Sequence, residues 1–104
     1  MGARYRVNIT AEALADLEQI SSYISHNSPR NAAAFIERIL DSVDALNILP
    51  TRHKIVGRSR RTGSRVHSMV VRPYIVYYRV EEGPGAVFIL TVRHGRRKQP
   101  RHFD

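Results

Sequence analysis

The strongest constraint on the fold is a β-hairpin predicted between residues 72 and 97. Two apolar runs rich in β-branched and aromatic residues, within 72–80 and 86–92, flank the turn Glu81-Glu82-Gly83-Pro84-Gly85. Apolar runs of this kind around a glycine- and proline-containing turn are typical of paired antiparallel strands. The second run leads directly into Arg93-His94-Gly95-Arg96-Arg97. The hairpin therefore brings a cluster of positive charge to one edge of a small domain, where an acidic partner can meet it.

The length and composition of the chain bound its class. A chain of 104 residues fits one domain, which can bury about two-thirds of its unfolded surface. It contains no cysteine, which excludes disulfides and thiolate metal sites and is consistent with a reducing compartment. No apolar run approaches the ~20 residues of a membrane span, and the N-terminus lacks the apolar core of a secretory signal. We expect a single cytoplasmic domain over residues 1–104, without a membrane partner and with a flexible basic tail from about residue 97.

The charge is distributed unevenly along the chain, whose formal net charge is +8. The first 49 residues contain four basic and six acidic residues, whereas residues 50–104 contain 13 basic and three acidic residues. Codon bias can explain why arginine outnumbers lysine, but it does not explain why acids become so rare in the second half. The asymmetry indicates a polyanionic or acidic partner.

Two helices are predicted after a short strand at residues 5–9. Thr10 can cap the first helix, which we expect from about Ala11 to His26. Ser28 and Pro29 begin the second helix, and Pro50 ends it. The apolar stripes expected to face the core are Leu14, Leu17, Ile20 or Ser21, and Ile24 in the first helix, and Ile36, Ile39, Leu40, Val43 and Leu46 in the second. The short connection predicts an antiparallel helical hairpin.

The region between the second helix and the β-hairpin divides into a loop and a strand. Residues 51–64 are rich in basic residues and poor in apolar ones, which predicts a mobile loop. Alternate side chains of residues 65–71 would point to opposite faces of a strand, with Val66 on one face and Met69 on the other, so this segment predicts a further strand. Arg72-Pro73 then predicts a bend. The resulting order, β-α-α-β-β-β, is that of an α+β domain in which a helical hairpin packs on a mostly antiparallel sheet.

Three segments taken together resemble the RelE/ParE superfamily of toxins from bacterial type II toxin–antitoxin modules. They are Ala15-Asp16-Leu17-Glu18-Gln19-Ile20 with Tyr23-Ile24, the run from Pro29 through Ala34-Phe35-Ile36 to Leu46 and Pro50, and the two hairpin strands 71–80 and 89–97. The resemblance covers nearly the whole chain. It implies the β-α-α-β-β-β fold, which the periodicity predicts independently.

The superfamily contains two mechanisms, and the resemblance favours one of them. RelE-like members cut mRNA in the ribosomal A site, whereas ParE-like members poison DNA gyrase and stabilise plasmids. The strand Pro-Tyr-Ile-Val-Tyr-Tyr-Arg-Val and the His-Gly-Arg-Arg ending are more similar to the ParE branch. RelE-like nucleases usually carry an arginine at the position of Ile75, and basic residues and a late tyrosine or histidine near the C-terminus. Arg96 and Arg97 can match the basic residues, but no tyrosine follows Tyr78 here. We therefore expect a gyrase inhibitor, with a ribosome-dependent mRNA endonuclease as the alternative.

The alternative activity requires a base, an acid and cations around the scissile phosphate. Its candidate residues are Arg79, His94 and Arg96, with His53 and His67 as further histidines. The plainer interpretation of His94 is an ordinary residue at a strand end. The five histidines are scattered without metal-ligand spacing, and no glycine-rich phosphate loop or catalytic triad pattern is present, so we expect no metal and no cofactor.

The ParE-like interpretation assigns binding roles instead of catalytic ones. Arg93, His94, Arg96 and Arg97 are the expected target contacts. The resemblance also implies a cognate antitoxin, ParD-like or RelB-like and acidic in its C-terminal half, with Arg72, Tyr77 and Arg79 as the expected contacts. For Arg79, an internal pair with Glu81 or Glu82, or stacking on Tyr77, is an equal alternative. A plain nucleic-acid-binding module is the third hypothesis.

Overall fold

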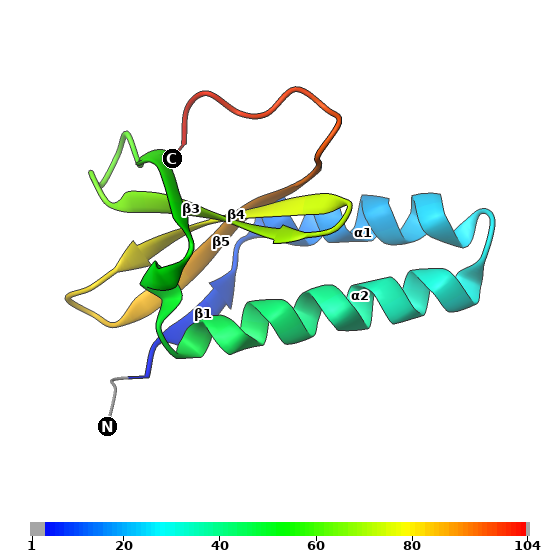
Figure 1. Ribbon diagram of the computed structural model, residues 1–104, viewed down its shortest axis with the longest axis horizontal. Coiled ribbons are helices and arrows are strands. Elements are labelled where there is room, and N and C mark those ends of the chain that lie inside the picture. The colour runs from blue at the N-terminus through cyan, green and yellow to red at the C-terminus, as the bar shows by residue number, and fades with distance from the viewer. Residues whose placement is uncertain (1–3, 104) are drawn as a thin grey trace.

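The computed structural model describes residues 4–103 as a five-stranded sheet with two helices against one face (Figure 1). The strands are β1 (Arg6–Ile9), β2 (Lys54–Arg58), β3 (Arg65–Val71), β4 (Tyr74–Glu81) and β5 (Ala86–His94). Their order in the sheet is β1-β5-β4-β3-β2, and only the β1–β5 pair is parallel. The predicted α+β architecture is therefore confirmed, with one strand more than the sequence predicts.

Helix α1 (Ala11–Ser25) begins where predicted, because Thr10 Oγ1 accepts a hydrogen bond from Ala13 N at 3.3 Å. The predicted core-facing stripe of α1 is confirmed at Leu17, Ile20 and Ile24 and differs at one position. Ala13, Leu17 and Ile20 are buried, whereas Leu14 is 51% exposed. The prediction that Leu14 faces the core was wrong, because Ala13 occupies the core-facing position one turn before Leu17. Leu14 follows Ala13 directly, so its side chain points about 100° away around the helix axis.

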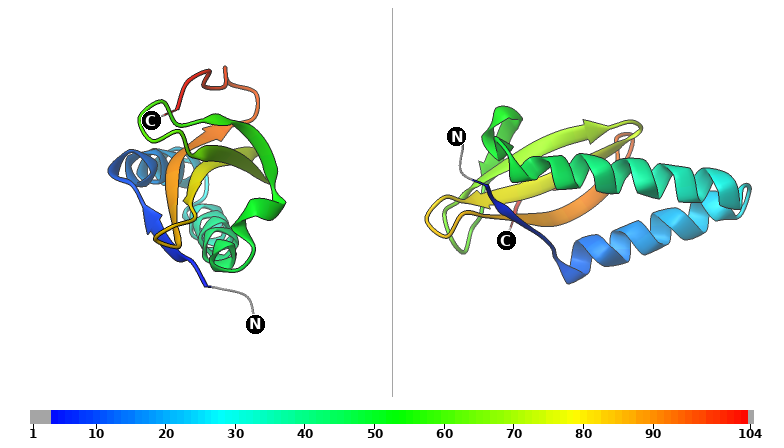
Figure 2. Two further views of the ribbon diagram at one scale, coloured as in Figure 1. Left: turned by 90° about the vertical axis from the view of Figure 1, so that its left-hand side faces the viewer. Right: turned by 90° about the horizontal axis from the view of Figure 1, so that it is seen from below.

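Helix α2 (Pro29–Asp44) is capped by Ser28, whose Oγ accepts a hydrogen bond from Asn31 N at 3.2 Å. It ends at Asp44, earlier than predicted, and short 3-10 turns follow at Ala45–Asn47 and Pro50–Arg52. Ile39, Val43 and Leu46 are buried as expected. The two helices run side by side across the same face of the sheet (Figure 2), which confirms the helical hairpin.

The main core lies between the helices and the sheet. Tyr78 is fully buried there, and its hydroxyl donates a hydrogen bond to Pro50 O at 2.5 Å. The opposite face of the sheet carries a second, smaller apolar cluster built from Val66, Tyr77 and Phe103. Phe103 belongs to the segment after β5, so the C-terminal end of the chain covers part of the face that the helices leave open.

Strand β2 corrects the prediction of a mobile loop over residues 51–64. Residues 54–58 pair antiparallel with β3, with Ile55 opposite His67 and a bulge before Gly57. Gly57 packs closely on the C-terminal segment, because a Cβ at this position would lie 3.1 Å from Phe103 Cε2 and the ring would have to shift. The sequence of β2 lacks the alternation of apolar and polar residues that marks a half-buried strand, because β2 is an edge strand with mostly exposed side chains.

The predicted hairpin is formed by β4 and β5, which pair from Tyr74–His94 to Glu81–Ala86 with an irregularity between Tyr77 and Tyr78. Arg72 and Pro73, joined by a cis peptide bond, make the turn from β3 to β4. Met69 and Val71 face the helices, as their alternation predicts. The C-terminal end of β5 thus lies beside the β3–β4 turn, and this proximity positions the site described next.

Candidate functional site

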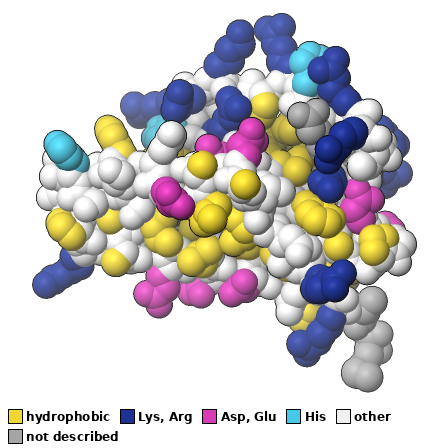
Figure 3. All heavy atoms as spheres, turned by 180° about the vertical axis from the view of Figure 1, so that it is seen from behind, with side chains coloured by type: hydrophobic (Ala, Val, Ile, Leu, Met, Phe, Trp, Pro, Cys, Tyr) yellow, Lys and Arg dark blue, Asp and Glu magenta, His cyan; other side chains and the backbone are white. Residues whose placement is uncertain are grey.

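The predicted target-binding residues follow β5 and form a basic rim, which we define as Arg93, His94, Arg96 and Arg97. The three arginines are exposed, and His94 is half-buried. Gly95 holds the rim against the β3–β4 turn, since its N donates to Pro73 O at 2.8 Å and a Cβ on it would lie 3.3 Å from that oxygen. On the face shown in Figure 3, many Lys and Arg side chains lie along the upper edge of the molecule.

His94 organises the backbone of the rim. Its Nδ1 accepts a hydrogen bond from Arg96 N at 3.0 Å, and its carbonyl oxygen accepts one from Arg97 N at 3.0 Å. The ring lies edge-on to Tyr74, with centroids 5.1 Å apart. Because Nδ1 serves as an acceptor, the proton of the neutral ring is on Nε2, which remains available as a donor.

A groove of about 610 Å³ separates the rim from helix α1. Its lining comprises Asp16, Gln19, Ile20, Tyr23, Tyr74, Val92, Arg93, His94 and Arg97. Asp16 Oδ2 is already engaged, since it accepts hydrogen bonds from Thr91 Oγ1 at 2.5 Å and from Val92 N at 3.0 Å. Tyr23 is 75% exposed, and burial raises the pKa of Tyr74, so Tyr74 stays neutral. The groove therefore combines cationic and aromatic walls.

The segment after the rim turns back across the open face of the sheet. Tyr77 OH donates to Gln99 Oε1 at 2.5 Å, and the rings of Tyr77 and Phe103 lie 5.4 Å apart. Arg60 N donates to Phe103 O at 2.8 Å, so this segment reaches the residues just after β2. These contacts hold Gln99 and Phe103 in place. The flexibility expected of the tail from about residue 97 stays a prediction.

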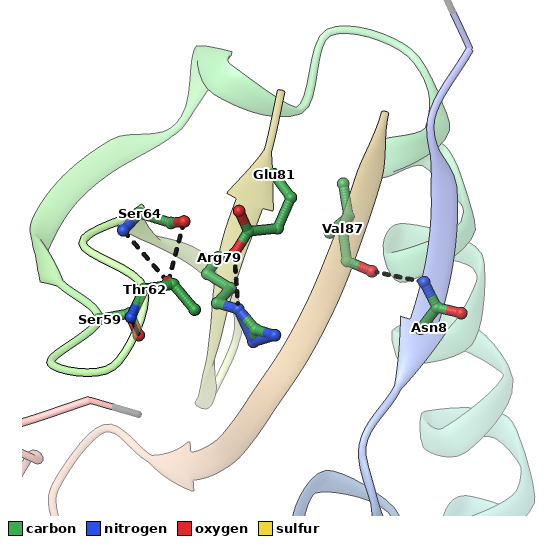
Figure 4. A network of polar contacts seen from close by, with 7 residues as sticks. All are labelled: Asn8, Ser59, Thr62, Ser64, Arg79, Glu81 and Val87. Atoms are coloured by element: carbon green, nitrogen blue, oxygen red, sulfur yellow. Dashed lines mark hydrogen bonds and ion pairs between the residues drawn. The ribbon is translucent and has the colours of Figure 1, made fainter. Parts of the chain in front are cut away.

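The three expected antitoxin contacts do not lie together. Arg79 pairs with Glu81 at 3.1 Å (Figure 4) and stacks over the ring of Phe88 at 4.2 Å, whereas its other expected partners, Glu82 and Tyr77, are not used. Tyr77 is 5% exposed beneath the C-terminal segment.

Arg72 lies apart from both, at the β3–β4 turn. It is exposed, and its carbonyl oxygen accepts a hydrogen bond from Arg38 Nη2. Sequence reasoning missed Arg38, as well as the groove residues Gln19 and Tyr23. No local pattern marks them, because the sites they join are formed by segments far apart in the chain.

The candidate nuclease set is only partly brought together. His94 and Arg96 are in contact, but Arg79 lies opposite Phe88, six residues before His94 on β5 and thus about 20 Å away along the strand. His67 is buried and stacked on Tyr78, with centroids 5.3 Å apart. Within residues 4–103, no three His, Asp or Glu side chains gather as metal ligands would, and no helix has the length and hydropathy needed to cross a membrane.

Comparisons with known proteins agree on one family. The family described as ParE toxin of the type II toxin–antitoxin system, parDE, matches residues 7–99 of this chain. A candidate toxin of Sinorhizobium fredii, Y4kP, is 36% identical over 94% of this chain and 96% of its own length. The toxin RelE2 of Caulobacter vibrioides is 34% identical over 85% of this chain and 92% of its own.

A solved structure supports the same fold. The chromosomal ParDE toxin–antitoxin system of P. aeruginosa contains a chain that superposes with a TM-score of 0.65, covering 88% of this chain and 97% of that one. The sequence identity in this pair is 23%, so the likeness concerns the fold.

Proposed function

Because this chain belongs to the ParE family of toxins from type II toxin–antitoxin systems, we propose that it inhibits DNA gyrase by binding rather than by chemistry of its own. The observation that carries this proposal is the basic rim at the end of β5. Its arginines are exposed, and the one ion pair within residues 4–103 is Arg79–Glu81, so the charges of the rim are available to a partner.

The rim is well suited to a binding role because its backbone is fixed. Gly95 and Arg96 are hydrogen-bonded to Pro73 O and His94 Nδ1, respectively, both next to the sheet. A backbone that is already ordered loses little further entropy when its cations meet an acidic surface or the DNA that gyrase holds. Arg93 Nη1 donates a hydrogen bond to Lys98 O at 3.5 Å, and the remaining donors of this exposed guanidinium group stay available to carboxylate or phosphate groups.

The geometry gives less support to the RelE-like alternative. A nuclease needs its cations and its proton donor around one phosphate. Arg79 is instead engaged by Glu81 and Phe88, on a part of the sheet distant from His94. Toeprinting of translated mRNA distinguishes the two activities: codon-linked cuts that disappear in His94→Ala and Arg96→Ala would establish the nuclease instead.

We further propose a cognate antitoxin, ParD-like or RelB-like, that neutralises the protein in the cytoplasm and so permits plasmid maintenance. The similar P. aeruginosa chain comes from a ParDE toxin–antitoxin system. An antitoxin segment with acidic and apolar residues would match the exposed Arg72. Tyr77 is covered by Gln99 and Phe103, so an antitoxin reaches it only by displacing the C-terminal segment.

The direct test adds purified protein to a gyrase supercoiling reaction. We expect supercoiling to stop and cleaved gyrase–DNA complexes to accumulate, and stoichiometric antitoxin to reverse both effects. The proposal would be refuted if a large excess of protein caused no inhibition of supercoiling and no accumulation of cleaved complexes.

A further inference from the structure

We propose that the turn between β2 and β3 is a second binding element, which takes the phosphate backbone of duplex DNA. This arginine turn comprises residues 58–65, and its charges are Arg58, Arg60, Arg61 and Arg65. The inference goes beyond the proposed function, because it concerns direct contact between this chain and DNA with no gyrase present.

The arginine turn lies in a stretch of the chain with a large excess of positive charge. Residues 45–80 contain eight arginines and lysines and no acidic residue. All four arginines of the turn are exposed, and the single ion pair within residues 4–103 lies elsewhere, at Arg79. Glu81 and Glu82 line a hollow together with Arg58 and Arg65, but none of the four guanidinium groups forms an ion pair within residues 4–103, so the turn keeps a net positive surface.

The register of β2 and β3 also brings two of these positive charges together, so that they repel each other. Arg58 lies directly opposite Arg65 in the β2–β3 pair. Like charges in directly opposite positions weaken the pairing of two strands. A polyanionic ligand would relieve this repulsion when it binds.

The arginine turn is nevertheless well ordered by its own hydrogen bonds. Ser59 N donates to Ser64 O at 2.8 Å, and Gly63 N donates to Ser59 O at 2.9 Å. Thr62 Oγ1 donates to Ser64 Oγ at 2.9 Å (Figure 4). Gly63 adopts φ +75°, a conformation that glycine tolerates best. Because the backbone of the turn is ordered before binding, only the arginine side chains lose conformational freedom when a ligand binds.

The C-terminal segment connects the arginine turn to the basic rim. Arg60 N is hydrogen-bonded to Phe103 O at 2.8 Å, which places Arg101 and His102 next to the turn. A hollow of about 330 Å³ lies between the turn and β5, with Arg61 and Arg93 both in its lining and Glu12 as its one acid. The two basic segments, separate in the sequence, therefore form one extended positive surface.

The composition of the arginine turn favours DNA over an acidic protein segment. Residues 58–65 read Arg-Ser-Arg-Arg-Thr-Gly-Ser-Arg and include no apolar side chain. A disordered protein segment that folds on binding must bury apolar surface, which this turn does not offer. Phosphate groups need only charge and hydrogen-bond donors, and arginine binds them with two donors at once. A two-stranded ribbon also has the dimensions that fit the major groove.

Fluorescence anisotropy with a labelled duplex, titrated with salt in the absence of gyrase, tests the inference. The variant R60Q/R61Q/R65Q removes three charges of the turn while leaving the Arg58 side chain, which donates to Gly63 O, in place. The variant R4Q/R6Q/R30Q removes three exposed charges outside the turn and serves as the control of equal net charge. Thermal melting of both variants verifies that they fold.

We expect the turn variant to weaken duplex binding by at least about tenfold at moderate salt and to lower the slope of log K against log salt by about 2 to 3, as the loss of three phosphate contacts requires. The control should change the affinity by less than about threefold.

Equal weakening by both variants would show a general charge effect and overturn the inference. So would a turn variant that loses binding to polyglutamate but keeps its affinity for the duplex. Gyrase inhibition is scored in a separate reaction, so either proposal can fail without the other.

Discussion

Asp16 Oδ2 on α1 accepts a hydrogen bond from Thr91 Oγ1 on β5 at 2.5 Å. The same oxygen accepts a second hydrogen bond from Val92 N at 3.0 Å. Strand β1 pairs with β5 only as far as Ile89, so this carboxylate takes the place of a strand partner for the residues that lead into the basic rim. The position of the rim therefore depends on a helix near the other end of the chain.

Replacing Asp16 should destabilise the protein. Asp16→Ala leaves the partly buried Val92 N–H without an acceptor, and we expect the free energy of unfolding to fall by about 1–3 kcal/mol. Glu18→Ala, an exposed change on the same helix, should stay within about 0.5 kcal/mol of the wild type. Urea denaturation measures both, and equal midpoints for the two variants would argue against the role of Asp16.

Removing the buried hydroxyl of Tyr78 should have a similar effect. Tyr78 OH donates to Pro50 O at 2.5 Å inside the core, and burial raises the pKa of this hydroxyl far above its ordinary value. Tyr78→Phe leaves the carbonyl oxygen unsatisfied and should cost about 1–2 kcal/mol of stability. Tyr23→Phe, at a residue that is 75% exposed, is the matched control and should be neutral in the same urea titration.

Stability should decrease in mild acid through His53. Burial, followed by the charges of Arg52 and His67, lowers the pKa of His53 in the folded protein. The unfolded chain then binds the proton more readily, so the folded state loses stability as the pH falls below the ordinary histidine pKa of about 6.5. Urea midpoints compared at two pH values, one on each side of that pKa, should differ less in His53→Gln than in the wild type. An unchanged difference would exclude His53 as a source of the effect.

The C-terminal segment should loosen when its anchor is removed. Phe103 is 7% exposed and packs on Tyr77 and Gly57. Phe103→Ala should lower stability by about 2 kcal/mol, less than a central core position, because this cluster is small. The amide of Arg60, which donates to Phe103 O, should then exchange faster with deuterium. His102→Ala, at an exposed neighbour, should leave that exchange rate unchanged.

Much of the fold follows from local patterns in the sequence. The hairpin was predictable because two apolar runs flank a turn that strands favour, and α1 because Thr10 caps an apolar helical stripe. Strand β2 was not predictable, since an edge strand that exposes most of its side chains lacks the alternation of apolar and polar residues. Leu14 was misplaced because Ala13, although small, takes the inward position at the sheet.

The candidate site was less predictable than the fold. The cluster of charge after β5 is contiguous in the sequence, so its arginines could be identified directly. The groove beside it also needs Tyr23 and Asp16 from α1, and only the packing of α1 on β5 brings them there. The contact between the arginine turn and Phe103 likewise joins segments about 40 residues apart, which no local pattern indicates.

The most direct test of the account is gyrase supercoiling in the presence of two charge-matched variants. R93Q/R96Q/R97Q removes three arginines of the basic rim, and R4Q/R6Q/R30Q removes three exposed arginines elsewhere. We predict that the wild type and the second variant inhibit supercoiling at similar concentrations, and that the rim variant needs at least about tenfold more protein, a loss of roughly 1.4 kcal/mol in binding. Equal inhibition by all three proteins, or none by the wild type, would contradict the account.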